Sequence, residues 1–243
     1  PMRFATFTSQ SRDGRLVVIS TDGRRYLEVG DTAPNLLGAI ERWDALMPRL
    51  SELADRLEQG EGDGFDPANC AAPLPRSWQW LDGSAFSTHG ELMQVAFGLD
   101  PIEAEKPLMY QGLSDRFYGP VDDVPFPGME HGIDFEGEYG VIVDHVPMGT
   151  DAAEAMKHIK LIVQINDWSL RAIAPVEMKT GFGWVQAKPA CSMAPFAVTP
   201  EELGDAWQDG RVCLDLEIDW NGKRFGAANG REMDVGFHDL IAH

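Results

Sequence analysis

Short apolar runs open the chain, and the spacing of apolar residues then changes from that of strands to that of helices. Runs at residues 3–7 and 16–20, joined by a turn that contains Asp-Gly, predict two short strands. Apolar residues next recur at helical spacing across residues 36–47, and a second amphipathic stretch covers residues 50–57. The first part of the chain therefore predicts a mixture of strands and helices.

A stretch rich in Gly and Pro separates this part from the rest of the chain. Glycines alternate with polar residues across residues 59–64, and sequence rich in Pro and Ala continues to Pro75. Such a composition is typical of loops and linkers. We therefore expect a small N-terminal α+β domain at residues 1–74 and a larger, strand-rich domain at residues 75–243.

Strand patterns dominate the second half of the chain. A helix-like segment at residues 151–159, which Asp151 is placed to cap, leads into an apolar strand at residues 160–165. Apolar and acidic residues alternate towards Trp220, and the Asn221-Gly222 pair that follows is the strongest short sequence signal for a hairpin. This alternation predicts a sheet with one face in water.

Two glutamates, Glu136 and Glu138, stand one residue apart before an apolar run that predicts a strand. Residues i and i+2 of a strand point to the same face, so the two carboxylates should project together. Two like charges this close repel each other unless a cation lies between them. Because hard divalent cations such as Mg²⁺ and Ca²⁺ take carboxylate oxygens as ligands, we interpret the pair as the centre of a metal site.

The composition restricts the partners of the chain. The 243 residues carry a formal net charge of −19, which argues against nucleic acid, because phosphate binding needs clustered Lys and Arg. No apolar run approaches the roughly 18 residues of a membrane span, so we expect no membrane association. Because a strand pattern starts at once, we expect no secretory signal, and three widely spaced cysteines suggest neither a disulfide framework nor a zinc site. These features predict a cytoplasmic protein.

Three further residues are candidates for chemistry, and each has a structural alternative. Asp167 ends an apolar strand, where it is either a third metal ligand or a turn aspartate. Lys188 lies among apolar residues, where it either neutralises ligating carboxylates or holds a substrate oxyanion, or else lies along the surface as a structural lysine. His89, seven residues after Asp82, is either a general base or a structural histidine.

Together these pieces resemble the bacterial branch of the fumarylacetoacetate hydrolase family. The matching motifs are Asp134-Phe-Glu-Gly-Glu-Tyr-Gly-Val-Ile-Val143, Asn166-Asp-Trp-Ser-Leu-Arg171, Gln186-Ala-Lys-Pro189 and Ser192-Met-Ala-Pro195. Each motif alone is weak, but their order and spacing match the family. The segments at residues 73–84 and 107–112 look typical of the bacterial branch, and the N-terminal part resembles its small leader domain.

The resemblance implies a metal site made of acidic residues. Glu136 and Glu138 fall on the family's paired metal ligands, and Asp167 falls on its third ligand. Asp82 falls on the fourth acidic ligand of the eukaryotic branch, because it keeps the seven-residue spacing to the histidine. Ser192 matches a hydroxyl residue beside the metal. Hard oxygen ligands favour Mg²⁺ over Zn²⁺, with Ca²⁺ or Mn²⁺ as alternatives.

The resemblance also implies roles for three residues around the metal. His89 matches the histidine that activates the hydrolytic water, and Lys188 matches a lysine near the metal and the substrate oxygens. Arg171 is expected to orient an acidic substrate. Two positions depart from the family: Leu92 stands where acylpyruvate hydrolases have a glutamate, and Ala174 stands where the eukaryotic branch has a glutamine.

The largest departure lies at the C-terminal end. Residues 237–241 predict a helix, and the chain ends at His243. Family members usually continue beyond this helix into a strand-rich segment that helps to close the fold and the pocket. We therefore expect the catalytic domain to be truncated at its C-terminus.

The family fold is a β-rich α+β fold, in which a rolled mixed sheet forms a barrel-like core, and its members are often homodimers. The implied function is metal-dependent hydrolysis of a carbon–carbon bond in a β-diketo acid. Fumarylacetoacetate, cleaved to fumarate and acetoacetate in tyrosine breakdown, is the first expected substrate. Three alternatives stay open: a 2-oxo-acid decarboxylase, isomerase or hydratase of the same family, a noncatalytic domain that Ca²⁺ stabilises, and a shortened, non-catalytic metal-binding relative that binds a small acid or a partner subunit.

Overall fold

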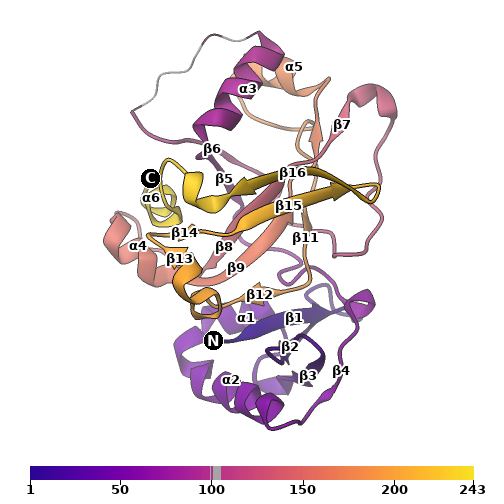
Figure 1. Ribbon diagram of the computed structural model, residues 1–243, viewed down its shortest axis with the longest axis vertical. Coiled ribbons are helices and arrows are strands. Elements are labelled where there is room, and N and C mark those ends of the chain that lie inside the picture. The colour runs from indigo at the N-terminus through magenta and orange to yellow at the C-terminus, as the bar shows by residue number, and fades with distance from the viewer. Residues whose placement is uncertain (99, 101–104) are drawn as a thin grey trace.

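The computed structural model describes residues 1–98, 100 and 105–243, without the side chains of residues 88–90 and 97. This part of the chain is an α+β fold with a β-rich centre (Figure 1), which confirms the predicted fold class. None of its described helices is both long and apolar enough to cross a membrane.

An eight-stranded sheet forms the centre of the described residues. Its strands are β1 (Arg3–Phe7), β2 (Arg15–Ile19), β3 (Arg25–Glu28), β4 (Asp63–Gly64), β8 (Gly137–Val143), β9 (Ile159–Asn166), β11 (Ser192–Met193) and β12 (Ala197–Val198). Strand β9 pairs with β8 along one edge and with β11 and β12 along the other. Strand β12 also pairs with β1, so the N-terminal strands continue the sheet that contains β8 and β9.

Two helices, α1 (Leu36–Glu41) and α2 (Trp43–Glu58), cover the N-terminal strands. Their apolar faces pack with Phe4 and Leu16 in one buried core. The sequence pattern predicted one helical stretch followed by another, but the break lies earlier than expected. It falls at Arg42, whose φ of −128° and ψ of 28° leave the helical range, and α2 then continues without interruption.

The longest ladder of the sheet carries the predicted glutamate strand. Strands β8 and β9 pair antiparallel, beginning with Gly137 opposite Asn166. Helix α4 (Ala152–His158) precedes β9. The Asp151 carboxylate accepts a hydrogen bond of 2.9 Å from the backbone N–H of Glu154, which confirms the predicted cap.

The predicted hairpin is confirmed as strands β15 (Asp215–Trp220) and β16 (Lys223–Asn229). Both residues of the Asn221-Gly222 turn are left-handed, with φ of 50° and 75°, as a tight hairpin requires. Ile218 of β15 packs on β8 so closely that a Cβ atom at Gly137 would lie 2.8 Å from Ile218 Cδ1. The hairpin therefore lies across the sheet at the residue between the two glutamates.

Shorter elements complete the described chain. Three two-stranded ribbons are β5 (Leu81–Ser84) with β6 (Leu108–Gln111), β7 (Ile133–Asp134) with β10 (Ser169–Leu170), and β13 (Trp207–Gln208) with β14 (Arg211–Val212). The remaining α-helices are α3 (Ser87–Phe97), α5 (Ala174–Thr180) and α6 (Phe237–Ala242), the last of which was predicted. Short 3₁₀ turns cover Gly30–Thr32, Pro67–Asn69, Met129–His131, Pro200–Ala206 and Gly230–Glu232. Helices α3 and α5 lie at the end of the molecule opposite α1 and α2 (Figure 1).

Candidate metal centre

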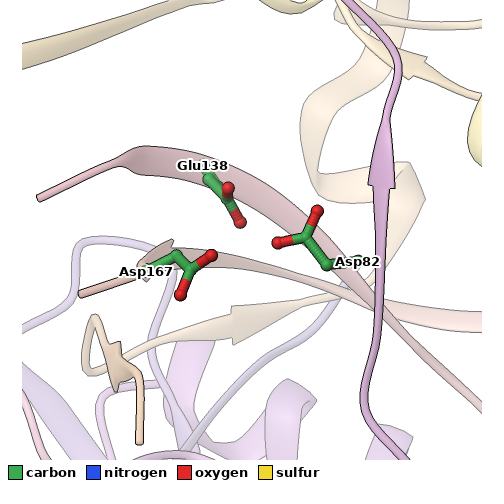
Figure 2. A group of neighbouring side chains, drawn as sticks. All are labelled: Asp82, Glu138 and Asp167. Carbon is green, nitrogen blue, oxygen red and sulfur yellow. The ribbon is translucent and has the colours of Figure 1, made fainter. Parts of the chain in front are cut away.

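Three carboxylates from different parts of the chain point toward one another (Figure 2). Asp82 lies on β5, Glu138 lies on β8, and Asp167 directly follows β9. One oxygen from each carboxylate lies within 4.8 Å of the others. At this separation a single cation could contact all three carboxylates.

The register of β8 and β9 explains why their acidic residues meet. Glu138 lies opposite Ile165, so its side chain and that of Ile165 share one face of the sheet. Asp167 is two residues further along and belongs to the same face. The backbone N–H of Asp167 donates a hydrogen bond of 2.9 Å to the Glu136 carbonyl, which extends the pairing past the end of the ladder. Glu136, Glu138 and Asp167 are therefore brought to one face.

Tyr110 connects Asp82 to Asp167. It lies opposite Asp82 in the β5–β6 ribbon, and its hydroxyl oxygen is 2.9 Å from Asp82 Oδ2 and 2.7 Å from Asp167 Oδ2. A hydroxyl has one hydrogen, so it donates to only one carboxylate at a time. The second contact is favourable when that carboxyl carries a proton and donates to the hydroxyl oxygen. These groups are thus arranged to share a proton when no cation is bound.

Burial and mutual repulsion raise the pKa of two of the carboxyls. Burial, followed by the charge of Asp167, raises the pKa of Asp82 from 3.8 to about 7. Burial also raises the pKa of Glu138 well above 4.5, and the charges of Asp82 and Asp167 add to this effect. A bound cation would favour the charged forms of both groups, because the ligands must lose their protons.

Lys188 is buried among these acidic side chains, with 10% of its side chain exposed. Its Nζ atom lies 3.0 Å from Glu136 Oε2, 2.9 Å from Asp167 Oδ2 and 2.7 Å from Ser169 Oγ. Burial alone would lower the pKa of Lys188, but Glu136 and Asp167 outweigh burial and raise the pKa above its ordinary value. The interpretation of Lys188 as a surface lysine is therefore wrong.

Glu136 is held between two positively charged side chains. Besides the contact with Lys188, its Oε1 atom accepts a hydrogen bond of 2.7 Å from Arg171 Nη2. Burial alone would raise the pKa of Glu136, but the charges of Lys188 and Arg171 lower the pKa below its ordinary value. Arg171 also donates from Nε to Asp134 Oδ2 at 2.8 Å. Glu136 therefore favours its ionised form and lies beside the converging carboxylates.

The donor set fits a hard divalent cation. Asp82, Glu138 and Asp167 offer only oxygen atoms, which suits Mg²⁺, Ca²⁺ or Mn²⁺ better than softer metals. Their side chains are half-buried or buried, so their repulsion is weakly screened by water. These three residues would hold the cation, with Glu136 next to them.

Two other predicted residues occupy different positions. Ser192 lies on β11 opposite Asn166, and its hydroxyl accepts a hydrogen bond of 2.8 Å from the Trp168 indole N–H. Ser192 thus lies beside the strand that precedes Asp167. His89 belongs to α3, but its side chain lies outside the described part of the structure. Its role as a base stays a prediction.

Sequence reasoning missed Tyr110, whose hydroxyl contacts two of the carboxylates, and Ser169, whose hydroxyl contacts Lys188. Tyr110 lies in a segment typical of the bacterial branch, but its pairing with Asp82 joins residues 28 positions apart, and no local pattern reveals such a contact. Ser169 offered a usable signal, because it lies two residues after Asp167. Cys191 also donates from Sγ to Asp167 Oδ1 at 3.4 Å, and burial raises the pKa of its thiol, which therefore stays protonated.

A cavity of about 510 Å³ lies beside the carboxylates rather than over them. Tyr110 and Trp184 line it, and their rings meet edge to face with centroids 5.9 Å apart. Asp82, Glu138 and Asp167 are absent from its described lining. Tyr110 therefore contacts both this cavity and the acidic group.

Comparison with known families identifies the chain. The family described as "Fumarylacetoacetase N-terminal domain 2" matches residues 2–76. The family described as "Fumarylacetoacetate (FAA) hydrolase C-terminal" matches residues 79–243. The chain belongs to the fumarylacetoacetate hydrolase family, as the sequence motifs predicted. Members of this family are enzymes, among them hydrolases and isomerases.

Named relatives within the family have different activities. The chain is 31% identical over 147 residues to 2,4-didehydro-3-deoxy-L-rhamnonate hydrolase of Sphingomonas sp. (strain SKA58), a match that covers 59% of this chain and 48% of the relative. It is 24% identical over 248 residues to the human mitochondrial oxaloacetate tautomerase FAHD2B, covering 96% of this chain and 76% of the relative. The chain thus spans about half the length of the first of these relatives.

A solved structure has the same fold. The maleylpyruvate hydrolase of Sphingobium sp. SYK-6, in complex with manganese (II) ion and pyruvate, superposes with a TM-score of 0.71 at 17% identity. The superposition covers 99% of this chain and 81% of that structure.

Proposed function

We propose that the protein is a metal-dependent hydrolase that cleaves a carbon–carbon bond in a β-diketo acid. The observation that carries the proposal is a buried group of carboxylates with the ammonium of Lys188 inside it. This arrangement offers positive charge at a place where a substrate could develop negative charge. The hydrolases among its relatives and structural neighbours support the choice of reaction.

The proposed ligands are Asp82, Glu138 and Asp167, with Glu136 as a fourth ligand and Ser192 nearby. A bound Mg²⁺, Mn²⁺ or Ca²⁺ would supply Lewis-acid polarisation of the substrate oxygens. Lys188 has a raised pKa, so it stays an ammonium at neutral pH and serves as a fixed charge and donor rather than as a base.

His89 is the proposed base, an assignment that rests on its sequence position seven residues after Asp82. In the proposed reaction, His89 accepts a proton from water, and the hydroxide oxygen bonds to a ketone carbon. The bond from that carbon to the neighbouring carbon then breaks. The leaving carbon keeps the electron pair and takes up a proton, so one water is consumed and two acids are released.

Fumarylacetoacetate is the proposed first substrate, and its cleavage would give fumarate and acetoacetate. The test is loss of its ultraviolet absorbance with protein treated with EDTA and then supplied with Mg²⁺ or Mn²⁺. Maleylpyruvate should be assayed in parallel, because a structural neighbour is a maleylpyruvate hydrolase. Turnover of neither acid, with the metal bound, would refute the proposed hydrolase.

Lys188→Met provides the sharpest variant. Loss of the ammonium should lower kcat by roughly 100-fold or more, as expected for a donor that stabilises developing charge. Lys157→Met is the matched control, because Lys157 pairs with Glu154 on the surface and is 70% exposed. Equal activity of the two variants would exclude a catalytic role for Lys188.

A second candidate is an isomerase or tautomerase of a 2-oxo acid, which the human relative favours. Such a reaction moves a proton between a carbon and an oxygen of the substrate without cleaving a carbon–carbon bond. Incubation with oxaloacetate in deuterated water distinguishes the two. Accelerated deuterium uptake at C3 with no cleavage of any β-diketo acid would favour the tautomerase.

A further inference from the structure

The guanidinium of Arg171 bridges two carboxylates, that of Asp134 at the end of β7 and that of Glu136 just before β8. Its Nε donates to Asp134 Oδ2 at 2.8 Å, and its Nη2 donates to Glu136 Oε1 at 2.7 Å. The Arg171 side chain is 22% exposed and that of Glu136 is 13% exposed, so water screens this contact only partly. The fork of donors on a guanidinium is rigid, so two such contacts fix its orientation.

Asp134 is itself held in place by the backbone. It pairs with Ser169 across the β7–β10 ribbon, and its Oδ1 atom accepts a hydrogen bond of 2.9 Å from the backbone N–H of Phe135. The backbone N–H of Arg171 donates to the Gly132 carbonyl at 2.8 Å. The ribbon therefore fixes both the carboxylate and the start of the arginine side chain.

The opposite side of Glu136 is in contact with Lys188. Nζ of Lys188 reaches Glu136 Oε2 at 3.0 Å and Asp167 Oδ2 at 2.9 Å. A chain of charged contacts thus runs from Asp134 through Arg171, Glu136 and Lys188 to Asp167. Asp134 is the outer end of this chain, with 42% of its side chain exposed.

We propose that Asp134 is a positioning residue, which orients Arg171 so that Arg171 fixes the carboxylate of Glu136, the fourth of the proposed metal ligands. This inference rests on the proposed metal-dependent function and assigns a part of that site to a residue outside it. It also gives Arg171 a different role from the substrate contact expected from the sequence. Arg171 would act on the site through Glu136.

The test is Mn²⁺ binding by Asp134→Asn, measured by isothermal titration on the full chain. Residues that orient metal ligands typically contribute roughly tenfold or more to metal affinity, so we expect about tenfold weaker Mn²⁺ binding. Asp13→Asn is the matched control, because Asp13 accepts from Arg76 Nε at the same distance of 2.8 Å. It should bind Mn²⁺ like the wild type.

A double-mutant cycle separates positioning from general damage. If Asp134 acts through Glu136, Asp134→Asn should have no further effect on Mn²⁺ affinity in a Glu136→Gln background. Arg171→Lys is a second test, since lysine keeps the charge but cannot bridge two carboxylates with a planar fork. It should reproduce the effect of Asp134→Asn with an unchanged melting temperature.

The outcomes separate this inference from the proposed function. Unchanged Mn²⁺ affinity in Asp134→Asn, or the same loss with and without Glu136, would overturn the positioning role alone. Mn²⁺ binding by the wild type without turnover of any acid, together with a cycle that shows coupling, would refute the hydrolase and support the positioning role. Lack of Mn²⁺ binding by the wild type would overturn both.

Discussion

The Tyr110 hydroxyl lies within hydrogen-bond distance of two carboxylates but has only one hydrogen to donate. The charge of the cation-free site therefore depends on whether one of these carboxyls carries a proton. Because the pKa of Asp82 is raised to about 7, the cation-free site takes up a proton as the pH falls through neutrality. A cation and this proton compete for the same oxygens. The acidic group is therefore expected to respond to pH through its affinity for metal.

Mn²⁺ affinity should fall as the pH decreases below about 7, because the pKa of Asp82 is raised to that value and its proton must leave before the oxygen binds metal. The slope should approach roughly tenfold per pH unit for each proton that the metal displaces. Isothermal titrations at pH values between about 5.5 and about 8, in steps of about one unit, would measure this change in Mn²⁺ affinity. Equal affinity across this range would contradict the prediction, and Asp82→Asn should reduce the slope, because the proton on Asp82 no longer competes with the metal.

The pKa of Asp82 also gives the cation-free protein a definite dependence of stability on pH. Its value in the folded chain, about 7, exceeds the ordinary 3.8, so the folded state binds the proton more tightly than the unfolded state. The contribution to stability is present at low pH and is lost as the pH rises from about 4 to about 7. A bound cation opposes this loss.

Single residues of the site were predictable where a motif surrounds them. Glu136 and Glu138 followed from strand periodicity, and Lys188 followed from a charge among apolar neighbours. Tyr110 was not predictable, because its contacts depend on the pairing of β5 with β6 and on the approach of that ribbon to β9. The contacts of Glu136 with Arg171 and Lys188 were likewise not predictable, because they join residues that are far apart in the sequence.

At the scale of elements, the β15–β16 hairpin acts on the site through the backbone. Ile218 packs against Gly137, the residue between the two glutamates. The Tyr139 hydroxyl donates to the Leu214 carbonyl at 3.2 Å and adds a second link between β8 and the segment before the hairpin. The position of the glutamate strand thus depends on how the hairpin packs.

Gly137→Val should therefore destabilise the protein by about 1–3 kcal/mol, because the added atoms overlap with Ile218. The same variant should weaken Mn²⁺ binding, since β8 carries Glu138. Thermal melting and Mn²⁺ titration are the measurements. Adding Ile218→Ala should recover part of both losses by making room, and lack of any recovery in the double variant would contradict this packing argument.

Elements with strong local signals were predictable from the sequence. The Asn221-Gly222 turn and the Asp151 cap each depend on residues within a few positions, and both were confirmed. The break at Arg42 was not predictable, because apolar residues keep their helical spacing on both sides of it.

At the scale of the whole molecule, one sheet joins both parts of the chain. Strand β1 pairs with β2 on one side and with β12 on the other, and β12 pairs with β9. The predicted boundary between residues 74 and 75 is crossed by this sheet. Stability gained at the acidic group is therefore expected to extend to the N-terminal strands.

Unfolding should occur as one transition that Mn²⁺ shifts as a unit. At 100 times its dissociation constant, the metal should add about 2.7 kcal/mol to the free energy of unfolding. Calorimetry and near-ultraviolet circular dichroism, recorded with Mn²⁺ and with EDTA, provide the measurement. Two separate transitions, of which only one responds to the metal, would show that the N-terminal part unfolds independently.

The pairing of β1 with β12 has a consequence for folding during synthesis on the ribosome. The Met2 backbone N–H donates to Thr199 Oγ1, a partner 197 residues later in the chain. At a synthesis rate of about 5–20 residues per second, β1 waits roughly ten to forty seconds before that partner is made. During this time one edge of the nascent N-terminal sheet is open, and an open edge readily pairs with other chains. We therefore expect that this edge must be protected from other chains until β12 has been synthesised.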